Sequence, residues 1–250
     1  MWPWLSLKIA ESTAEWAQCR PEHTSLAVLQ LDALEALIAL PNYSAALQAQ
    51  QILSQAELDR LESFSHGKRR LEWLGGRLAA KYALQRFLTS SPPGTPPAAL
   101  VLENDRHGRP FINVSCLCPE PSLSISHSGR FAAALVASSP CGLDLQEIVP
   151  KLQRLQARFA GPAELALGKN YDTLSWLALL WAAKEAVKKC CYADQPTFME
   201  RIQVEAHAGD AAASQGTALS CRLQDAKAAA PVRAALRQGY ALAMIVNLKE

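Results

Sequence analysis

The chain has 250 residues, of which 50% are apolar and 19% are charged, and this composition excludes an intrinsically disordered protein. The 25 basic and 23 acidic residues give a formal net charge of +2, which excludes a protein that binds nucleic acid or membranes through an overall basic surface. A chain of this length forms one large domain or two domains of about 125 residues each.

No segment of the sequence indicates export or membrane insertion. The first residues lack a basic region followed by an apolar run, and the longest uncharged apolar stretch, 174–183, is about half of a membrane span. The seven cysteines include no C-x-x-C pair, so we interpret them as small apolar residues in a reducing compartment. These features predict a soluble, cytoplasmic protein without a membrane partner.

The first hundred residues contain one expected strand and two expected helices. Alternating apolar residues predict a strand over 26–32, and helical periodicity predicts helices over 46–64 and 69–88. A capping-box spacing that begins at Ser54 starts a new turn within the first helix. The proline-rich segment 90–98 is expected to be a loop.

The rest of the chain alternates between expected strands and one helical block. Three short strands separated by Ser-Gly and Ser-Pro turns suggest an antiparallel meander, a helix-rich block follows over 151–191, and three further strands close the chain. The six strands are expected over 123–127, 130–138, 141–147, 201–208, 218–225 and 239–248. The pattern predicts an α+β fold in which helices and a three-stranded antiparallel sheet occur twice, although no residue-level repeat is evident.

The segment 174–190 has charged residues where an apolar helix surface is expected. Lys184, Glu185 and Lys188 continue the stripe formed by its leucines and Trp181. Buried lysine and glutamate are costly unless they are paired or bind an ion. The alternative is a helix end whose lysines reach solvent and pair with Glu185.

The strand 141–147 places two oxygen-bearing side chains on one face. Asp144 and Gln146 are two residues apart and therefore point the same way, whereas Glu147 points to the opposite face. This arrangement suits either one hard cation or a solvated strand edge.

The segment 65–88 carries six basic residues against one acidic residue. On a helix Arg70, Arg77 and Lys81 project close together, and Gly75–Gly76 would let a backbone or a ligand approach. The pattern fits an anion site, most naturally for phosphate, or a solvated basic face with packing glycines.

Two turns present further polar residues. Arg109 lies in a turn between Gly108 and Pro110, and His127 ends a strand just before a turn. Ser126 and His127 do not form a hydrolase triad, because no G-x-S-x-G motif occurs and the two side chains point to opposite strand faces.

Five segments together resemble the larger, single-chain (surfactin-synthetase-activating) type of 4′-phosphopantetheinyl transferase. They occur in the family's order over residues 65–189 and read GGRLAAKYAL, HGRPFI, LSISHSGRFAAALVA, CGLDLQE and WAAKEAVKK. The combination of a G-[ILV]-D-[ILV] strand with a W-x-x-K-E-A-x-x-K helix is the most specific part of the resemblance.

The resemblance implies a pseudo-twofold pair of similar α+β halves in one chain, and hence a monomer. Residues 1–139 would form the coenzyme A adenosine and phosphate side, and residues 140–250 the Mg²⁺-binding and catalytic side. A serine hydroxyl of an apo acyl or peptidyl carrier protein would attack the β-phosphorus of coenzyme A. The carrier would gain the phosphopantetheine arm, and 3′,5′-ADP would leave.

The same resemblance implies roles for residues of the second half. Asp144 and Glu185 match the Mg²⁺-binding carboxylates, and Glu185 would also take the serine proton, directly or through water. Gln146 stands where many members have a third acid, so it would ligate Mg²⁺ or a ligating water without adding a charge. Lys184 and Lys188 match lysines that hold the phosphates, and Lys188 would stabilise the departing oxygen.

In the first half, the resemblance implies contacts with the phosphates of coenzyme A. Ser126 and His127 match residues around the adenosine 3′-phosphate. Arg109, together with Arg70 and Arg77, would hold the same phosphate or the pyrophosphate.

Two other functions are compatible with parts of the sequence. A coenzyme A-binding regulatory protein without transferase activity is favoured only by Gln146, whereas Asp144, Glu185 and the lysines favour the enzyme. A nucleic-acid binder that uses the basic segment would need an aromatic-interleaved basic sheet, which the sequence lacks. We therefore expect no nucleic-acid partner.

Overall fold

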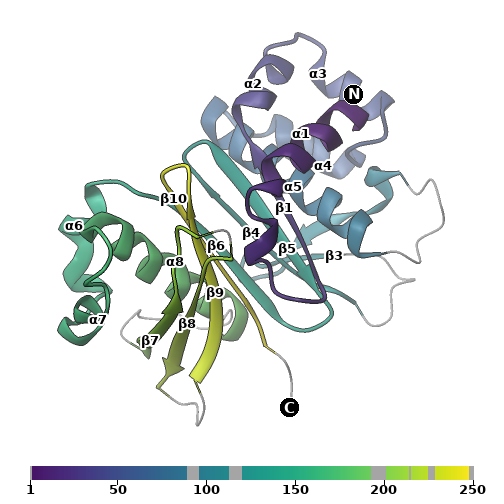
Figure 1. Ribbon diagram of the computed structural model, residues 1–250. Coiled ribbons are helices and arrows are strands. Elements are labelled where there is room, and N and C mark those ends of the chain that lie inside the picture. The colour runs from purple at the N-terminus through teal and green to yellow at the C-terminus, as the bar shows by residue number, and fades with distance from the viewer. Residues whose placement is uncertain are drawn as a thin grey trace. The chain divides into compact units, whose positions relative to one another are not determined.

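The computed structural model describes residues 2–88, 96–112, 120–192, 201–213, 215–224 and 229–247. The chain divides into two compact units, the first formed by Met1–Ala14 with His23–Ser138 and the second by Glu15–Glu22 with Ser139–Glu250. Each unit combines helices with an antiparallel sheet, which confirms the predicted α+β fold class (Figure 1). The twofold relation between the halves stays a prediction.

The first unit contains a three-stranded antiparallel sheet, as predicted. Its strand order is β1-β5-β4, with β1 at Thr24–Gln30, β4 at Ser122–Ser128 and β5 at Phe131–Ala137. A separate two-stranded ribbon, β2 (Leu102–Asn104) with β3 (Pro110–Ile112), was not predicted.

The helices of the first unit pack on one face of this sheet. They are α1 (Trp2–Ala14), α2 (Asp32–Ile38), α3 (Tyr43–Ala49), α4 (Gln55–Glu62), α5 (Gly67–Phe87) and the short η2 (Pro97–Ala99). Alternate strand residues such as Ala27, Ala132 and Ala134 form a common core with the helices, because side chains alternate between the faces of a strand. The sequence did not predict α1 and α2, and residues 89–95 of the expected loop lie outside the described residues.

The predicted capping box is confirmed, and it divides the expected helix 46–64 in two. Ser54 caps α4: its hydroxyl accepts from the Glu57 N–H, and Glu57 Oε2 accepts from the Ser54 N–H at 2.9 Å. This reciprocal pair satisfies N–H groups that a helix start otherwise leaves free.

The second unit has five strands, so the expectation of a three-stranded sheet is wrong there. The order is β6-β10-β9-β8-β7. The strands are β6 (Cys141–Glu147), β7 (Ile202–Gly209), β8 (Thr217–Leu223), β9 (Ala229–Arg237) and β10 (Tyr240–Val246). The predicted meander is also wrong in part, since β4 and β5 form a hairpin but β6 pairs with β10.

Strand β9 was not predicted from the sequence, because this segment is rich in alanine and contains Pro231. Proline cannot donate to a strand ladder and usually argues against a central strand. Pro231 pairs with Ser220 of β8, whereas the pairing of β9 with β10 begins only at Arg233. The proline is tolerated because it lies where β9 has only one neighbour in the described pairing.

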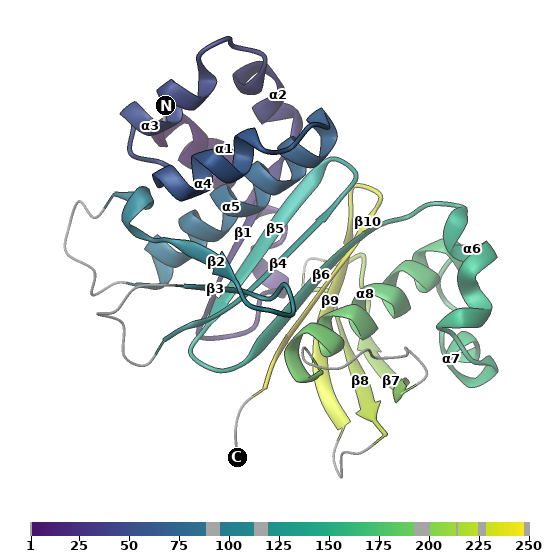
Figure 2. The same ribbon diagram turned by 180° about the vertical axis from the view of Figure 1, so that it is seen from behind.

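The helices of the second unit centre on one long buried helix. They are the short η1 (Ala17–Cys19), α6 (Lys151–Leu155), η3 (Gln156–Arg158), α7 (Pro162–Leu167) and α8 (Thr173–Cys191). Asp172 caps α8 by accepting from the Ser175 N–H at 3.0 Å. The helix lies along the sheet, where its alanines and leucines share a core with Ala241, Ala243 and Ile245 (Figure 2). Among the described helices, none has the length and apolar character needed to cross a membrane.

The two units share a strand arrangement that the sequence did not reveal. In the first, β1 pairs with β5 over seven residues from Thr24↔Ala137 to Gln30↔Phe131. In the second, β6 pairs with β10 over seven residues from Cys141↔Val246 to Glu147↔Tyr240. Both β5 and β10 follow two-residue turns from the strand on their other side. In this register Asp144 corresponds to Ala27.

Each unit also contains a buried ion pair in the same setting. Lys81 of α5 pairs with Glu57 at 2.8 Å, and Lys184 of α8 pairs with Glu164 of α7 at 2.7 Å. Each glutamate also accepts from the N–H three residues before it, at the start of a short helix. Both lysines lie within an A-A-K-x-A sequence, in which Tyr82 corresponds to Glu185. A residue-level repeat is therefore present, but it is confined to these positions.

Candidate functional site

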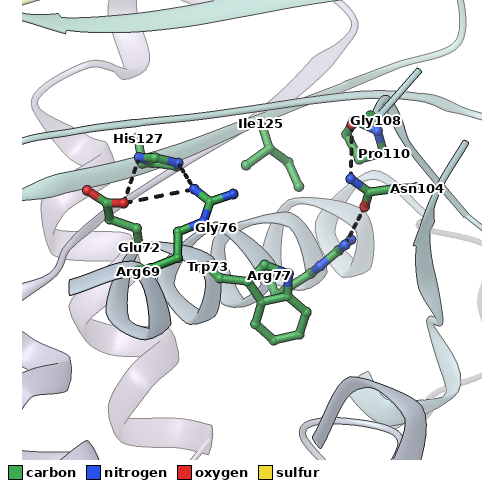
Figure 3. Close-up of a pocket in the computed structure, with 10 residues that line it drawn as sticks. All are labelled: Arg69, Glu72, Trp73, Gly76, Arg77, Asn104, Gly108, Pro110, Ile125 and His127. Atoms are coloured by element: carbon green, nitrogen blue, oxygen red, sulfur yellow. Dashed lines mark hydrogen bonds and ion pairs between the residues drawn. The ribbon is translucent and has the colours of Figure 1, made fainter. Parts of the chain in front are cut away.

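A cavity of about 180 Å³ opens in the first unit between α5, β4 and the turn from β2 to β3. Figure 3 shows its lining, with side chains from all three segments directed toward the same space. The lining residues are Arg69, Glu72, Trp73, Gly76, Arg77, Asn104, Gly108, Pro110, Ile125 and His127. Arg77 and His127 were predicted to bind coenzyme A, and the structure brings them into one cavity.

The two glycines of α5 allow the helix to approach the strands closely. A Cβ at Gly75 would lie 2.2 Å from Leu31 Cδ2, and a Cβ at Gly76 would lie 2.9 Å from Ile125 Cγ2. The packing interpretation therefore accounts for both positions. Gly76 also lines the cavity.

Arg77 contributes a buried guanidinium to the cavity. It is 7% exposed, its Nη2 donates to Asn104 Oδ1 at 2.5 Å, and its Cζ lies 5.1 Å from the centroid of the Trp73 ring. Burial lowers the pKa of Arg77, and the nearby Glu57 partly offsets this effect. Its Nη1 has no hydrogen-bond partner among the residues that the structure describes. A buried donor without an acceptor is costly, so this position is suited to an anionic ligand.

A second group of charged residues lies on the other side of the cavity. Arg69 Nη1 lies 3.2 Å from His127 Nε2, and Glu72 Oε2 lies 3.7 Å from His127 Nδ1 (Figure 3). Arginine can only donate, so we assign Nε2 as the acceptor and place the proton of neutral His127 on Nδ1, facing Glu72. Arg69 and Glu72 were not predicted as site residues, although their positions two turns and one turn before Gly76 could have indicated them.

Three of the coenzyme A residues predicted in the first half of the chain do not line this cavity. Arg70 turns its Nη2 to the carbonyl of Phe64 at 2.7 Å. Arg109 is exposed between two lining residues, and its backbone N–H donates to Asp105 Oδ1 at 2.9 Å. Ser126 is buried on β4, where it alternates with the lining residues Ile125 and His127 and so points to the other face of the strand.

In the second unit, Asp144 faces α8. The residue is 7% exposed, and its Oδ1 accepts from Lys189 Nζ at 2.7 Å. The same ammonium donates to the carbonyl of Leu143 at 2.9 Å. Gly142 allows this contact, because a Cβ there would lie 1.9 Å from the carbonyl oxygen of Ala186.

The acid of the helix lies one turn before Lys189. Glu185 and Lys189 are four residues apart and therefore share a face of α8. Glu185 Oε1 lies 3.3 Å from Lys188 Nζ, with side chains that are 19% and 36% exposed. Counted from Trp181, the last lysine of the W-x-x-K-E-A-x-x-K spacing is Lys189 and not Lys188. The phosphate-binding lysine of the motif was therefore predicted one residue too early, at Lys188, although the spacing alone indicates Lys189.

Lys184 occupies a different environment from the one predicted. It is 1% exposed, and its Nζ donates to the carbonyl of Phe159 at 2.6 Å and to both carboxylate oxygens of Glu164, at 2.7 and 3.0 Å. These contacts use the three protons of the ammonium group. The structure therefore argues against a phosphate-binding role for Lys184, and its partner Glu164 was not identified from the sequence.

The donor set of this region suits a magnesium ion. Asp144 and Glu185 provide two carboxylates, and Gln146 lies on the same face of β6 as Asp144. The Nε2 of Gln146 donates to the Glu147 carbonyl at 2.7 Å, and this bond does not use its amide oxygen, which can ligate a metal ion. Mg²⁺ takes oxygen ligands and usually binds one or two carboxylates together with phosphates and water. No cluster of three or more His, Cys, Asp or Glu that could hold a metal occurs in the described parts of the chain. Two carboxylates with an amide oxygen nevertheless fit an ion that also binds phosphate.

Comparison with known proteins identifies the family. Residues 140–245 match the model of the 4′-phosphopantetheinyl transferase superfamily. The holo-[acyl-carrier-protein] synthase of Streptococcus uberis is 35% identical over 88 residues, which cover 35% of this chain and 74% of that protein. The chain belongs to the 4′-phosphopantetheinyl transferase superfamily.

Two further members of the superfamily are similar over part of the chain. The 4′-phosphopantetheinyl transferase of Bacillus subtilis is 30% identical over 99 residues, which cover 38% of this chain and 43% of that protein. A crystal structure of a holo-(acyl-carrier-protein) synthase from Bacillus anthracis, in complex with CoA (3′,5′-ADP), aligns with a TM-score of 0.39 at 25% identity. That alignment covers 45% of this chain and 91% of the other.

Proposed function

We propose that this member of the superfamily transfers the 4′-phosphopantetheine arm of coenzyme A to a serine of an apo acyl or peptidyl carrier protein. One observation carries the proposal: the segment that matches the superfamily contains both β6 and α8, and Lys189 of α8 contacts Asp144 of β6 at 2.7 Å. The expectations of a cytoplasmic location and a monomeric state belong to the same proposal.

In the proposed reaction the side chains of β6 and α8 would hold the metal ion beside coenzyme A and deprotonate the serine of the carrier protein. Asp144 and Glu185 would hold Mg²⁺, with Gln146 as a neutral ligand or as a partner of a ligating water. The bound metal supplies positive charge to the pyrophosphate of coenzyme A. Glu185 accepts the proton of the carrier serine, directly or through a water, as the serine oxygen bonds to the β-phosphorus. The bond from that phosphorus to the bridging oxygen breaks, and 3′,5′-ADP leaves with the electron pair.

The lysines that follow Glu185 would stabilise the charge on the bridging oxygen. We assign this role to Lys189, because its ammonium group already lies beside Asp144. Lys188 is the second candidate, since its ammonium group lies 3.3 Å from Glu185 Oε1. The variants Lys189→Met and Lys188→Met separate them: loss of the leaving-group contact lowers kcat more than it raises KM for coenzyme A.

The cavity of the first unit would bind the adenosine 3′-phosphate. Arg77 has an unpartnered buried nitrogen among the described residues, and Arg69 adds a second guanidinium, beside His127, on the opposite side. Arginine binds phosphate through charge-assisted hydrogen bonds. Residues 1–139 are thus the proposed adenosine and phosphate side, and residues 140–250 the proposed Mg²⁺-binding and catalytic side. Arg109, Arg70 and Ser126 stay predictions outside this cavity.

Mass spectrometry of the carrier tests the proposal. An apo carrier protein incubated with coenzyme A, Mg²⁺ and this protein should gain the mass of one phosphopantetheine arm. The variant Glu185→Gln keeps the shape of the side chain but cannot take the serine proton, so it should leave the carrier mass unchanged over the same period. Coenzyme A binding without any mass gain, tested over a panel of carriers, would instead support a regulatory protein without transferase activity.

A further inference from the structure

A buried ion pair outside the proposed site links α7, α8 and β7. Glu164 is 5% exposed and Lys184 is 1% exposed, and both carboxylate oxygens of Glu164 contact the ammonium group. Glu164 also accepts from the backbone N–H groups of Gly161 and Val204, each at 2.9 Å. Every oxygen of this carboxylate is thus engaged by two donors, and three separate elements meet at one side chain.

This ion pair anchors α8 to α7 directly beside Glu185, the proposed catalytic acid. Lys184 directly precedes Glu185, and consecutive helix residues point about 100° apart. With Lys184 held toward α7, Glu185 must lie on the adjacent face, which is also the face of Lys189 and its contact with Asp144. The indole Nε1 of Trp176, two turns earlier on α8, donates to the Glu164 carbonyl at 2.9 Å. The rotation of α8 about its axis is therefore fixed at two points by the same glutamate.

We propose that Glu164 and Lys184 are positioning residues that set the orientation of Glu185, and that Lys184 is not a phosphate ligand. This inference rests on the proposed function of Glu185. A buried ion pair adds little stability over apolar residues of similar size, so its effect on Glu185 can be measured separately from its effect on stability. Groups that orient metal ligands without touching the metal typically change metal affinity when they are replaced.

The chain provides a matched control in its first unit. Lys81 and Glu57 form the corresponding buried pair, with exposures of 0% and 3%. Lys81 also donates to two backbone carbonyls, as Lys184 does to one. The residue after Lys81 is Tyr82, whose side chain has no carboxylate that could ligate magnesium. The same chemical change at this pair should therefore have the same structural cost without moving a metal ligand.

The test compares two double variants, Lys184→Met with Glu164→Gln and Lys81→Met with Glu57→Gln. Both partners are changed because the loss of one partner leaves a buried unpaired charge. Two quantities are measured on the folded full-length proteins, both at saturating coenzyme A because Glu57 lies near Arg77. They are the dissociation constant of Mn²⁺, from the electron paramagnetic resonance signal of free Mn²⁺, and the half-saturating Mg²⁺ concentration for transfer. Thermal unfolding monitors the structural cost.

The inference predicts that the Glu164–Lys184 double variant raises both constants about tenfold. The Glu57–Lys81 double variant should leave both constants at the wild-type values, while its unfolding temperature falls about as much as that of the Glu164–Lys184 double variant. Equal shifts in the two double variants, or no shift in either, would overturn the inference. If a double variant does not fold, Glu164→Asp and Glu57→Asp shorten the two carboxylates while keeping their charge, and the same comparison decides. A wild-type protein that neither transfers the arm nor binds Mn²⁺ with coenzyme A refutes the proposed function itself.

Discussion

The variant Gly142→Ala tests how closely α8 must approach β6. The added Cβ would lie 1.9 Å from the carbonyl oxygen of Ala186, 2.9 Å from its carbonyl carbon and 3.0 Å from Cys190 Cβ. Carbon–oxygen contacts normally begin at about 3.3 Å, so the helix and the strand must separate locally by more than about 1 Å. The contact is with helix backbone, which cannot rotate away as a side chain can. Overpacking of this kind typically costs about 1–3 kcal/mol, and we expect a value near the upper end.

Urea denaturation and thermal unfolding measure this cost. For a chain of this size, about 2–3 kcal/mol corresponds to a fall in Tm of roughly 5–10 °C. The control is Gly67→Ala at the first residue of α5, where an added Cβ meets nothing within 4 Å. This control should leave the free energy of unfolding unchanged or raise it by up to about 1 kcal/mol. A Gly142→Ala protein within about 0.5 kcal/mol of the wild type, which is the range of ordinary surface substitutions, would refute the packing argument.

Three further predictions concern a helix cap, the metal and the anion cavity. Asp172→Ala removes the α8 cap and should cost about 1 kcal/mol at pH 7 in urea denaturation. The hydrogen bonds from Ser175 lower the pKa of Asp172 below its usual 3.8, so the contribution of the charged cap is present above pH 3.8 and is lost as the pH falls through the lowered value. A difference from wild type that stays constant down to pH 2 would contradict this. Gln146→Glu should lower the half-saturating Mg²⁺ concentration for transfer, and no decrease would count against a position near the metal. Arg77→Leu should weaken binding of 3′,5′-ADP about tenfold by calorimetry and leave 5′-AMP unaffected, whereas equal losses would contradict contact with the 3′-phosphate.

The sequence predicted the elements whose patterns are strong and local. Continuous or alternating apolar runs located β4, β5, β6 and α8 to within a few residues. The pairing of β6 with β10 could not be predicted in the same way, because it joins segments about a hundred residues apart and β6 follows β5 through a short turn. The turn spacing predicts a meander in which β6 pairs with β5, but β6 pairs with β10.

The candidate site was predictable where neighbouring residues define it. The face shared by Asp144 and Gln146 follows from strand alternation, and the position of Glu185 follows from helix periodicity. The buried ion pair of Lys184 could not be predicted from local sequence, because its partner Glu164 lies twenty residues earlier on a separate short helix. An unpaired lysine on an apolar helix indicates that an anion is nearby, but the sequence cannot distinguish a ligand phosphate from a carboxylate of the protein.

The correspondence between the two units shows which residues of the first unit occupy the positions of the proposed acids. Ala27 occupies the register position of Asp144, and Tyr82 follows the lysine that corresponds to Lys184. The strand pairing and the buried ion pair are common to both units, whereas the two carboxylates are not. The proposed chemistry is thus confined to the second unit.

The central claim is that an acid of β6 and an acid of α8 bind the same divalent ion. Crystals grown with coenzyme A and Mn²⁺ test it directly, because the anomalous scattering of manganese locates the ion without reference to a model. We predict one anomalous peak within ligation distance of both Asp144 and Glu185, next to the pyrophosphate. A peak that contacts neither carboxylate, or carboxylates that stay apart with coenzyme A bound, would contradict the account.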